Sequence, residues 1–300
     1  MPLRIEGNSP SVSLRSRWLG QQLRQLREDR GLTLRFVADG LGVEYAEVAA
    51  HEHGRHMFHH GKVAALLDLY RVYDDVERDH LLRLARDAFR LPRWEDDFHA
   101  PALDVSRLDF LWLESVADRI RCYSTTLVPD LLRTPSYVEA VVRRESPPMI
   151  ADEQVRWWVR AFCDRQQILN AATSTEVQAV IAEAALRRPV GGAANTLQVQ
   201  LAKTADGGSV QARVLPATAT YLPGMDGSFT VFELPKPYPN AVACTPHLGG
   251  VAIHQERATK WYADVFDRLW RVALPPQDAA TLIADAADLL PVNELSEGGH

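Results

Sequence analysis

The sequence contains little cysteine, little lysine and no long apolar run. Its three cysteines, Cys122, Cys163 and Cys244, lie far apart without a CxxC pair, which argues against a disulfide framework and a cysteine-rich zinc site. No stretch approaches the roughly 18 to 20 apolar residues of a membrane-spanning helix, and the opening MPLRIEGNSP lacks the apolar segment of a secretion signal. We therefore expect a soluble, cytoplasmic protein.

The charge balance argues against a general polyanion binder. The 300 residues carry 33 basic and 39 acidic side chains, a formal net charge of −6, and only four of the basic residues are lysine. The hydrophobic fraction of 46% and the charged fraction of 24% are typical of a globular protein with a substantial core. Any role in nucleic-acid binding therefore requires a locally basic face.

The length predicts about two domains, and the patterning changes near residue 100. Residues 14–90 show apolar side chains at spacings of three and four, which predicts five short helices, with Thr33 capping the second and Asp74 the fifth. Residues 91–104 contain two prolines and four acidic residues, as a linker does. We expect a first domain over 1–90, this linker, a second domain over 105–292 and a flexible tail over 293–300.

The second domain mixes helical and strand patterns. Residues 106–124 read as a helix followed by a strand, and residues 152–170, 254–272 and 276–290 as helices. Strand patterns cover residues 176–181, 210–215 and 228–234. The predicted fold is an all-α bundle followed by an α+β domain.

The segment LTLRFVADGLGVEYAEVAAHEHGR has the order helix, three-residue turn, helix, with Ala38 under the turn and Gly42 relaxing it. Together with SPSVSLRSRWLGQQLRQLREDRG before it and LLDLY after it, this segment resembles the Xre-type helix-turn-helix regulators. VPDLLRTPSYVEA, FCDRQQIL, AEAALRRPVGG and DGSFTVFEL are similar to recurring phrases of the Scr-type subgroup, whose second domain is antitoxin-like and effector-binding. The resemblance implies a dimeric transcription regulator that joins a DNA-binding domain to a domain for a ligand or a small partner protein.

The recognition helix departs from that family. Where these regulators carry a leading serine, a lysine and a serine-arginine pair, this sequence has Glu44, Glu47, Ala49 and Ala50, and no lysine or arginine occurs from 44 to 52. Phosphate binding depends on cations, although a glutamate can accept a hydrogen bond from cytosine. The DNA-contact positions, if functional, are Glu44, Glu47, Ala50 and Arg55. We expect a helix-turn-helix scaffold with weakened or lost DNA contacts.

Two further features of the first domain have mainly structural interpretations. Glu52 occupies a position that these regulators keep as a structural glutamate, and we assign it to the scaffold. Five of the ten histidines lie between residues 51 and 60. They could form a metal site or a pH-sensitive surface, but Gly54 interrupts the helical i, i+4 spacing of a ligand pair, so we expect a solvated or partly packed loop without metal.

Aromatic and polar residues of the second domain predict a pocket. Trp157 and Trp158 are adjacent on a helix, about 100° apart, so both cannot face one core. The candidate ligand-binding residues are Tyr123, Trp157, Trp158, Arg165, Gln166, Glu183, Tyr221 and His247. Core packing is the alternative for the aromatic residues, and structural ion pairs or buried hydrogen bonds are the alternative for the polar ones.

No GxSxG, HExxH, P-loop or GxGxxG motif is present, so we predict no cofactor and name no catalytic residue. The leading hypothesis is a regulator-like protein whose second domain binds a small molecule or a small partner. One alternative is a repurposed, cofactor-independent enzyme that catalyses a cyclisation or rearrangement in specialised metabolism within the aromatic pocket. Another is an antitoxin-like partner protein without DNA binding.

Overall fold

The computed structural model describes residues 13–56, 59–89, 105–145, 150–169, 175–191, 200, 210–235, 238, 241–247, 250–255, 257–275, 278–279 and 282. The chain forms two compact units, and the division falls between residues 112 and 113, inside helix α6 (Val105–Val116). The predicted linker over 91–104 and the tail over 293–300 lie outside the described residues. The predicted domain boundaries stay predictions.

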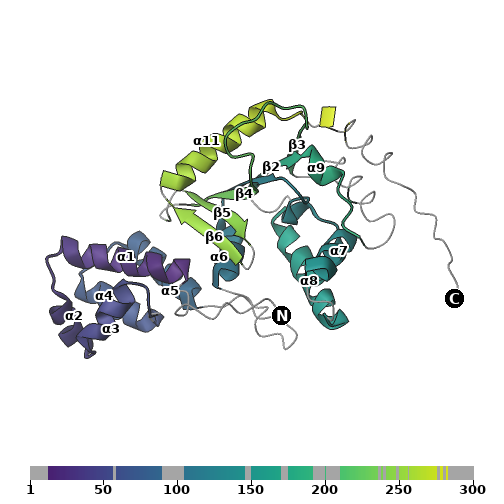
Figure 1. Cartoon of the computed structure of the whole chain (residues 1–300). Coiled ribbons are helices and arrows are strands. Elements are labelled where there is room, and N and C mark those ends of the chain that lie inside the picture. The colour runs from purple at the N-terminus through teal and green to yellow at the C-terminus, as the bar shows by residue number, and fades with distance from the viewer. Residues whose placement is uncertain are drawn as a thin grey trace. The chain divides into compact units, whose positions relative to one another are not determined.

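The first unit is helical, as predicted (Figure 1). It contains α1 (Leu14–Asp29), α2 (Leu34–Leu41), α3 (Tyr45–Glu52), α4 (His60–Leu69), α5 (Asp75–Phe89) and the first part of α6. Its core is built from fully buried apolar side chains, among them Leu23, Val37, Val48, Val63, Leu67, Leu81 and Leu84. The apolar residues spaced three and four apart in the sequence therefore lie on the buried faces of these helices, as predicted.

A buried ion pair joins α6 to the start of α1. The carboxylate of Asp109 accepts hydrogen bonds from the Leu14 backbone N–H at 2.6 Å and from Arg15 Nε at 3.1 Å. The side chains of Arg15 and Asp109 are both 3% exposed, and Trp112 packs edge-on against Trp18 one turn further along. These contacts make the first two turns of α6 part of the helical unit.

The second unit is built on a six-stranded mixed sheet with the strand order β3-β2-β1-β4-β5-β6 (Figure 1). The strands are β1 (Arg119–Ser124), β2 (Glu176–Ala182), β3 (Gln211–Leu215), β4 (Phe229–Glu233), β5 (Ala241–His247) and β6 (Gly250–Gln255). β1, β2 and β3 pair in parallel, whereas β4, β5 and β6 extend the sheet in antiparallel fashion. The predicted α+β class is confirmed.

Helices pack on both faces of this sheet because successive residues of a strand point to opposite sides. On one face, α11 (Arg257–Val272) buries Val265, Phe266 and Leu269 against Tyr123, Phe229 and neighbouring strand residues. On the other face, α7 (Pro135–Glu145) and α9 (Glu183–Leu186) pack with Ile181 and Val214. The helix α8 (Asp152–Arg165) in turn packs against α7.

Two of the sequence predictions need correction in this unit. The helix expected from residue 254 begins only at Arg257, since residues 250–255 form β6, and β5 was not predicted at all. The helix expected over 152–170 ends at Arg165 and continues as a 3-10 turn, Gln166–Leu169. The helix expected over 276–290 lies mostly outside the described residues. Among the described residues, no helix is long and apolar enough to span a membrane.

Candidate functional site

The helix-turn-helix segment is formed by α2, the turn after it and α3. Thr33 caps α2 by accepting a hydrogen bond from the Phe36 N–H at 3.2 Å. Gly42 ends α2 in the left-handed conformation, with φ 66°, and the Val43 N–H bonds to the carbonyl of Ala38, which is buried. The predicted roles of Thr33, Ala38 and Gly42 are thus confirmed.

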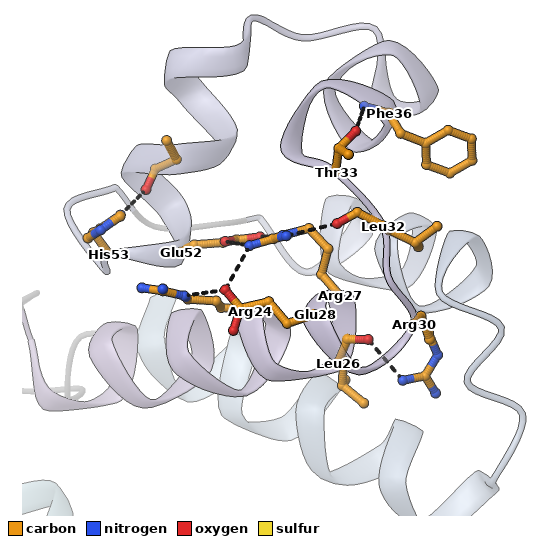
Figure 2. A network of polar contacts seen from close by, with 11 residues as sticks. Arg24, Leu26, Arg27, Glu28, Arg30, Leu32, Thr33, Phe36, Glu52 and His53 are labelled. Atoms are coloured by element: carbon orange, nitrogen blue, oxygen red, sulfur yellow. Dashed lines mark hydrogen bonds and ion pairs between the residues drawn. The ribbon is translucent and has the colours of Figure 1, made fainter.

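A buried ion pair fixes α3 against α1 (Figure 2). Arg27 Nε lies 2.6 Å from Glu52 Oε1, and Arg27 Nη2 lies 2.9 Å from Glu52 Oε2. Arg27 Nη1 also donates to the Leu32 carbonyl at 2.8 Å, which ties down the chain that leads into α2. The Glu52 side chain is only 3% exposed, so it holds the scaffold and is closed to a ligand.

The outward side of α3 carries acidic and small side chains. Glu44 is exposed at the N-cap and makes no capping hydrogen bond with its side chain, and Tyr45 beside it is also exposed. Glu47 Oε1 lies 2.6 Å from Lys62 Nζ, and this contact lowers the pKa of the Glu47 carboxyl. Ala50 is half-buried. Lys62, the one lysine of this unit, therefore neutralises Glu47 at the centre of α3.

Most cations of residues 14–70 have a structural partner. Arg15 and Arg27 are buried in ion pairs, Arg24 bonds to Glu28, and Arg30 Nη1 bonds to the Leu26 carbonyl. Within the described part of the chain, the exposed cations of this stretch whose side chains make neither an ion pair nor a hydrogen bond are Arg17, Arg35 and Arg55. Residues 14–70 carry eight cations and seven anions, a net charge of +1, and the surface offers fewer available cations than this net charge indicates.

The histidine-rich stretch occupies the end of α3 and the start of α4. His51 is buried, with its Nδ1 2.9 Å from the His56 carbonyl and its Nε2 3.6 Å from Glu47 Oε1, and burial lowers its pKa. His53, His56 and the residues that follow at the start of α4 are exposed. No group of side chains suited to a metal ion occurs among the described residues.

In the second unit, one predicted pocket residue, Arg165, belongs to a largely buried ionic cluster, and a second, Gln166, lies beside it. The Arg165 guanidinium binds both carboxylate oxygens of Glu114 at 2.8 Å and lies 3.6 Å from Asp130. Burial works against the charge of Arg165, but the two carboxylates raise the pKa of its guanidinium. The neighbouring Gln166 donates from Nε2 to the Arg133 carbonyl at 2.6 Å.

The sequence prediction missed three members of this cluster, Glu114, Asp130 and Arg133. Arg133 is buried, donates to the Val128 carbonyl at 2.8 Å and reaches Asp130 at 2.9 Å. The signal for Glu114 was available, because it interrupts the apolar run FLWLESV. Arg133 gave no comparable signal, since its segment VPDLLRTP reads as an ordinary loop.

The other predicted pocket residues lie in separate places. Tyr123 is buried under α11, with its ring 5.7 Å from that of Phe229. Trp157 is buried, and Trp158 is half-buried against the α7–α8 core with its ring edge-on to Trp157. The two tryptophans differ in exposure, and their role in a pocket stays a prediction.

Two of the remaining polar candidates, Glu183 and Tyr221, form hydrogen bonds with other residues of the second unit. Glu183 accepts a hydrogen bond from the Ala217 N–H and pairs with Arg187, and the Ala217 bond and this pair lower its pKa. The Tyr221 hydroxyl is exposed and donates to Asp226. His247 lies in β5, and its side chain lies outside the described structure. The structure therefore brings Arg165 and Gln166 together, and Trp157 and Trp158, but does not gather all eight candidates around one point.

The helix-turn-helix geometry of α2 and α3 places the first unit in the class of helix-turn-helix proteins, which includes DNA-binding regulators. Comparison with known families agrees, since residues 18–81 match the family described as "Helix-turn-helix domain". Residues 108–285, more than half of the chain, match "Domain of unknown function (DUF5753)", and the protein belongs to that family. No curated protein and no solved structure matches the chain.

Proposed function

We propose that this protein is a regulator-like helix-turn-helix protein of the Xre type whose affinity for duplex DNA at neutral pH is weak. The observation that carries the proposal is the outward side of α3, where Glu47 is paired with Lys62 and no arginine or lysine is present from 44 to 52. Affinity for a duplex comes largely from cations that neutralise phosphates. The first unit therefore keeps the packed scaffold of a DNA-binding helix-turn-helix but lacks most of the positive charge that would bind phosphates.

The second unit then carries the specific recognition, of a small molecule or a small partner protein. The cluster of Glu114, Arg133 and Arg165, whose side chains are buried, with the partly exposed Asp130 supports this assignment, because burying charged groups is costly and such groups occur often at functional sites. We further propose that the protein acts in the cytoplasm as a homodimer, the state that its resemblance to Xre-type regulators implies.

The proposal is tested by restoring charge to the outer face of α3 in the full-length chain. Glu47→Gln frees Lys62, and Glu47→Lys adds a second cation, so affinity for genomic duplex fragments at about 50 mM salt should rise stepwise. Each additional phosphate that the protein neutralises is expected to raise the affinity about tenfold at this salt concentration. Ala50→Arg, added to Glu47→Lys, should raise the affinity again.

Asp79→Lys is the matched control, because it makes the same change of charge at an exposed position of α5, outside the helix-turn-helix. Equal increases for Asp79→Lys and Glu47→Lys would reflect total charge and would contradict the assigned face. Tight binding of one defined site by the unmodified protein would show that the proposed weakness is wrong.

A further inference from the structure

A turn rich in histidine follows the recognition helix directly. It comprises His53, Gly54, Arg55 and His56, called here the histidine turn, and the side chains of both histidines and of Arg55 are exposed. In related docking geometries the C-terminal end of the recognition helix contacts the DNA backbone. The turn therefore lies where a phosphate contact is expected, and it carries one permanent cation and two imidazoles.

The turn is held in one conformation by backbone hydrogen bonds. Gly54 adopts a left-handed φ of 68°, its N–H bonds to the His51 carbonyl at 2.8 Å, and the Arg55 N–H bonds to the Ala50 carbonyl at 2.8 Å. A Cβ on Gly54 would lie 2.8 Å from Arg17 Cα, so the turn rests directly against α1. Its exposed side chains are consequently presented by a rigid backbone.

The histidines of the stretch differ in the contacts that their rings make. His53 Nδ1 lies 2.7 Å from the Ala49 carbonyl, so Nδ1 carries the hydrogen and donates it to that carbonyl. A protonated His53 would sit at the C-terminal end of α3, where the helix dipole favours positive charge. The carbonyl of His56, and not its ring, makes the bond to His51, and the side chain of His56 is exposed.

The other three histidines of the stretch, His51, His59 and His60, lie in different surroundings. His51 is buried and lies beside the His56 ring. His59 accepts a hydrogen bond from the Gly61 N–H through Nδ1 and caps α4, so full protonation would remove that cap. His60 is the first residue of α4, where the dipole disfavours a positive charge.

The charged groups around the turn favour an anion only modestly in the neutral state. They are Arg55 in the turn, Arg17 on α1, the Glu47–Lys62 pair on α3 and α4, and the Arg27–Glu52 pair beneath. Both pairs are internally neutral. Histidine gains its charge between about pH 8 and pH 5. Protonation of His53 and His56 would therefore raise the local excess of positive charge from two, Arg17 and Arg55, to four.

We propose that the histidine turn binds the phosphate backbone of duplex DNA when His53 and His56 are protonated, so that the protein holds DNA more tightly in mildly acidic solution than at neutral pH. This inference rests on the proposed function, because it assigns to the turn the phosphate contacts that α3 lacks. The partner is a duplex of any sequence, since phosphates carry no sequence information.

The test is a binding titration of the full-length protein with a short random-sequence duplex at about pH 6 and about pH 7.5, over a series of salt concentrations. We expect affinity at about 50 mM salt to be about tenfold or more higher at the lower pH. The slope of log affinity against log salt should steepen by about one to two units, because each phosphate neutralised contributes about 0.9. Circular dichroism at both pH values confirms that the fold is retained.

Three variants locate the effect. His53→Gln with His56→Gln should remove the pH dependence, and His53→Arg with His56→Arg should bind at both pH values as the unmodified protein does at the lower one. His60→Gln, the matched control in the same stretch, should keep the pH dependence. Equal affinity of the unmodified protein at both pH values, or a pH dependence that survives His53→Gln with His56→Gln, would overturn the inference and leave the proposed function standing. Absence of binding even by the double arginine variant and by Glu47→Lys would overturn both.

Discussion

Glu52 offers the sharpest test of how the helix-turn-helix is held together. Its carboxylate is buried between α1 and α3 and receives two hydrogen bonds from Arg27 (Figure 2). Glu52→Gln keeps the shape of the side chain and removes its charge. The substitution therefore leaves the buried guanidinium of Arg27 without its main counter-charge.

The expected loss follows from the contacts that remain. Removing one partner of a buried ion pair costs about 3 to 5 kcal/mol. Arg27 keeps its bond to the Leu32 carbonyl and a 3.3 Å contact with Glu28 Oε1, and the amide oxygen of the new side chain can still accept one bond. We therefore expect a loss near the lower end, about 3 kcal/mol, in the free energy of unfolding of the helical unit.

Hydrogen exchange measured by mass spectrometry on the full-length protein resolves this loss by segment. Peptides from α1 and α3 should lose protection by about 100-fold, since about 1.4 kcal/mol corresponds to a factor of ten. Glu28→Gln is the matched control, because Glu28 contacts the same guanidinium but its side chain is 44% exposed. Its loss should be far smaller, since exposed ion pairs are screened by solvent. Similar losses for the two variants would refute the assigned role of the buried pair.

Three further predictions concern pH, backbone conformation and thiol reactivity. Burial lowers the pKa of His80, so below about pH 6.5 the unfolded chain takes up a proton that the folded chain refuses. The helical unit should lose stability as the pH falls through this range, and His80→Gln should reduce that loss in amide exchange; an unchanged pH dependence in the variant would contradict this. Gly42→Ala and Gly54→Ala both place an L-residue at a left-handed φ, of 66° and 68°, but a Cβ at 54 would also lie 2.8 Å from the backbone of α1. Thermal unfolding should show about 1 kcal/mol lost for Gly42→Ala and clearly more for Gly54→Ala, whereas equal losses would count against the close approach. Burial raises the pKa of Cys122 to about 12 and Cys163 is exposed, so a thiol reagent at about pH 8 should modify Cys163 before Cys122, and labelling of Cys122 before Cys163 in peptide maps would be the opposite result.

Patterning predicted most of the fold because most of its elements carry a local signal. The five helices of the first unit, with caps at Thr33 and Asp74, are amphipathic and end at residues suited to turns. The strands β2, β3 and β4 are short apolar runs bounded by polar loops. β5 and β6 lacked such a signal: β5 contains Pro246 and small residues, and β6 leads almost directly into the amphipathic pattern of α11. Their pairing is set by the sheet, which a local pattern does not report.

Side-chain sites were predicted less well because they depend on contacts between distant segments. Arg165 and Gln166 were predicted as candidate ligand-binding residues, with a structural ion pair or buried hydrogen bond as the alternative, but the buried acid that holds Arg165 lies 51 residues earlier, in α6. Glu47 was recognised as an unusual acid on the recognition helix, but its partner Lys62 lies on the next helix, across the histidine-rich stretch. The sequence shows which residue types are present, but only the fold shows which distant residues they contact.

The scaffold and the DNA contacts of a helix-turn-helix can change independently because they use different sides of the same helix. Val48, His51 and Glu52 face the interior of the unit, where a substitution alters packing or leaves a charge unpaired. Glu44 and Glu47 face outward, where most substitutions have little effect on stability. A match to the helix-turn-helix family therefore depends on the residues on the inner side of α3. The charge available to bind DNA depends on the residues on its outer side. On that outer side the permanent cations are few and Lys62 is already paired, which is why the proposed phosphate contacts are assigned to the histidine turn.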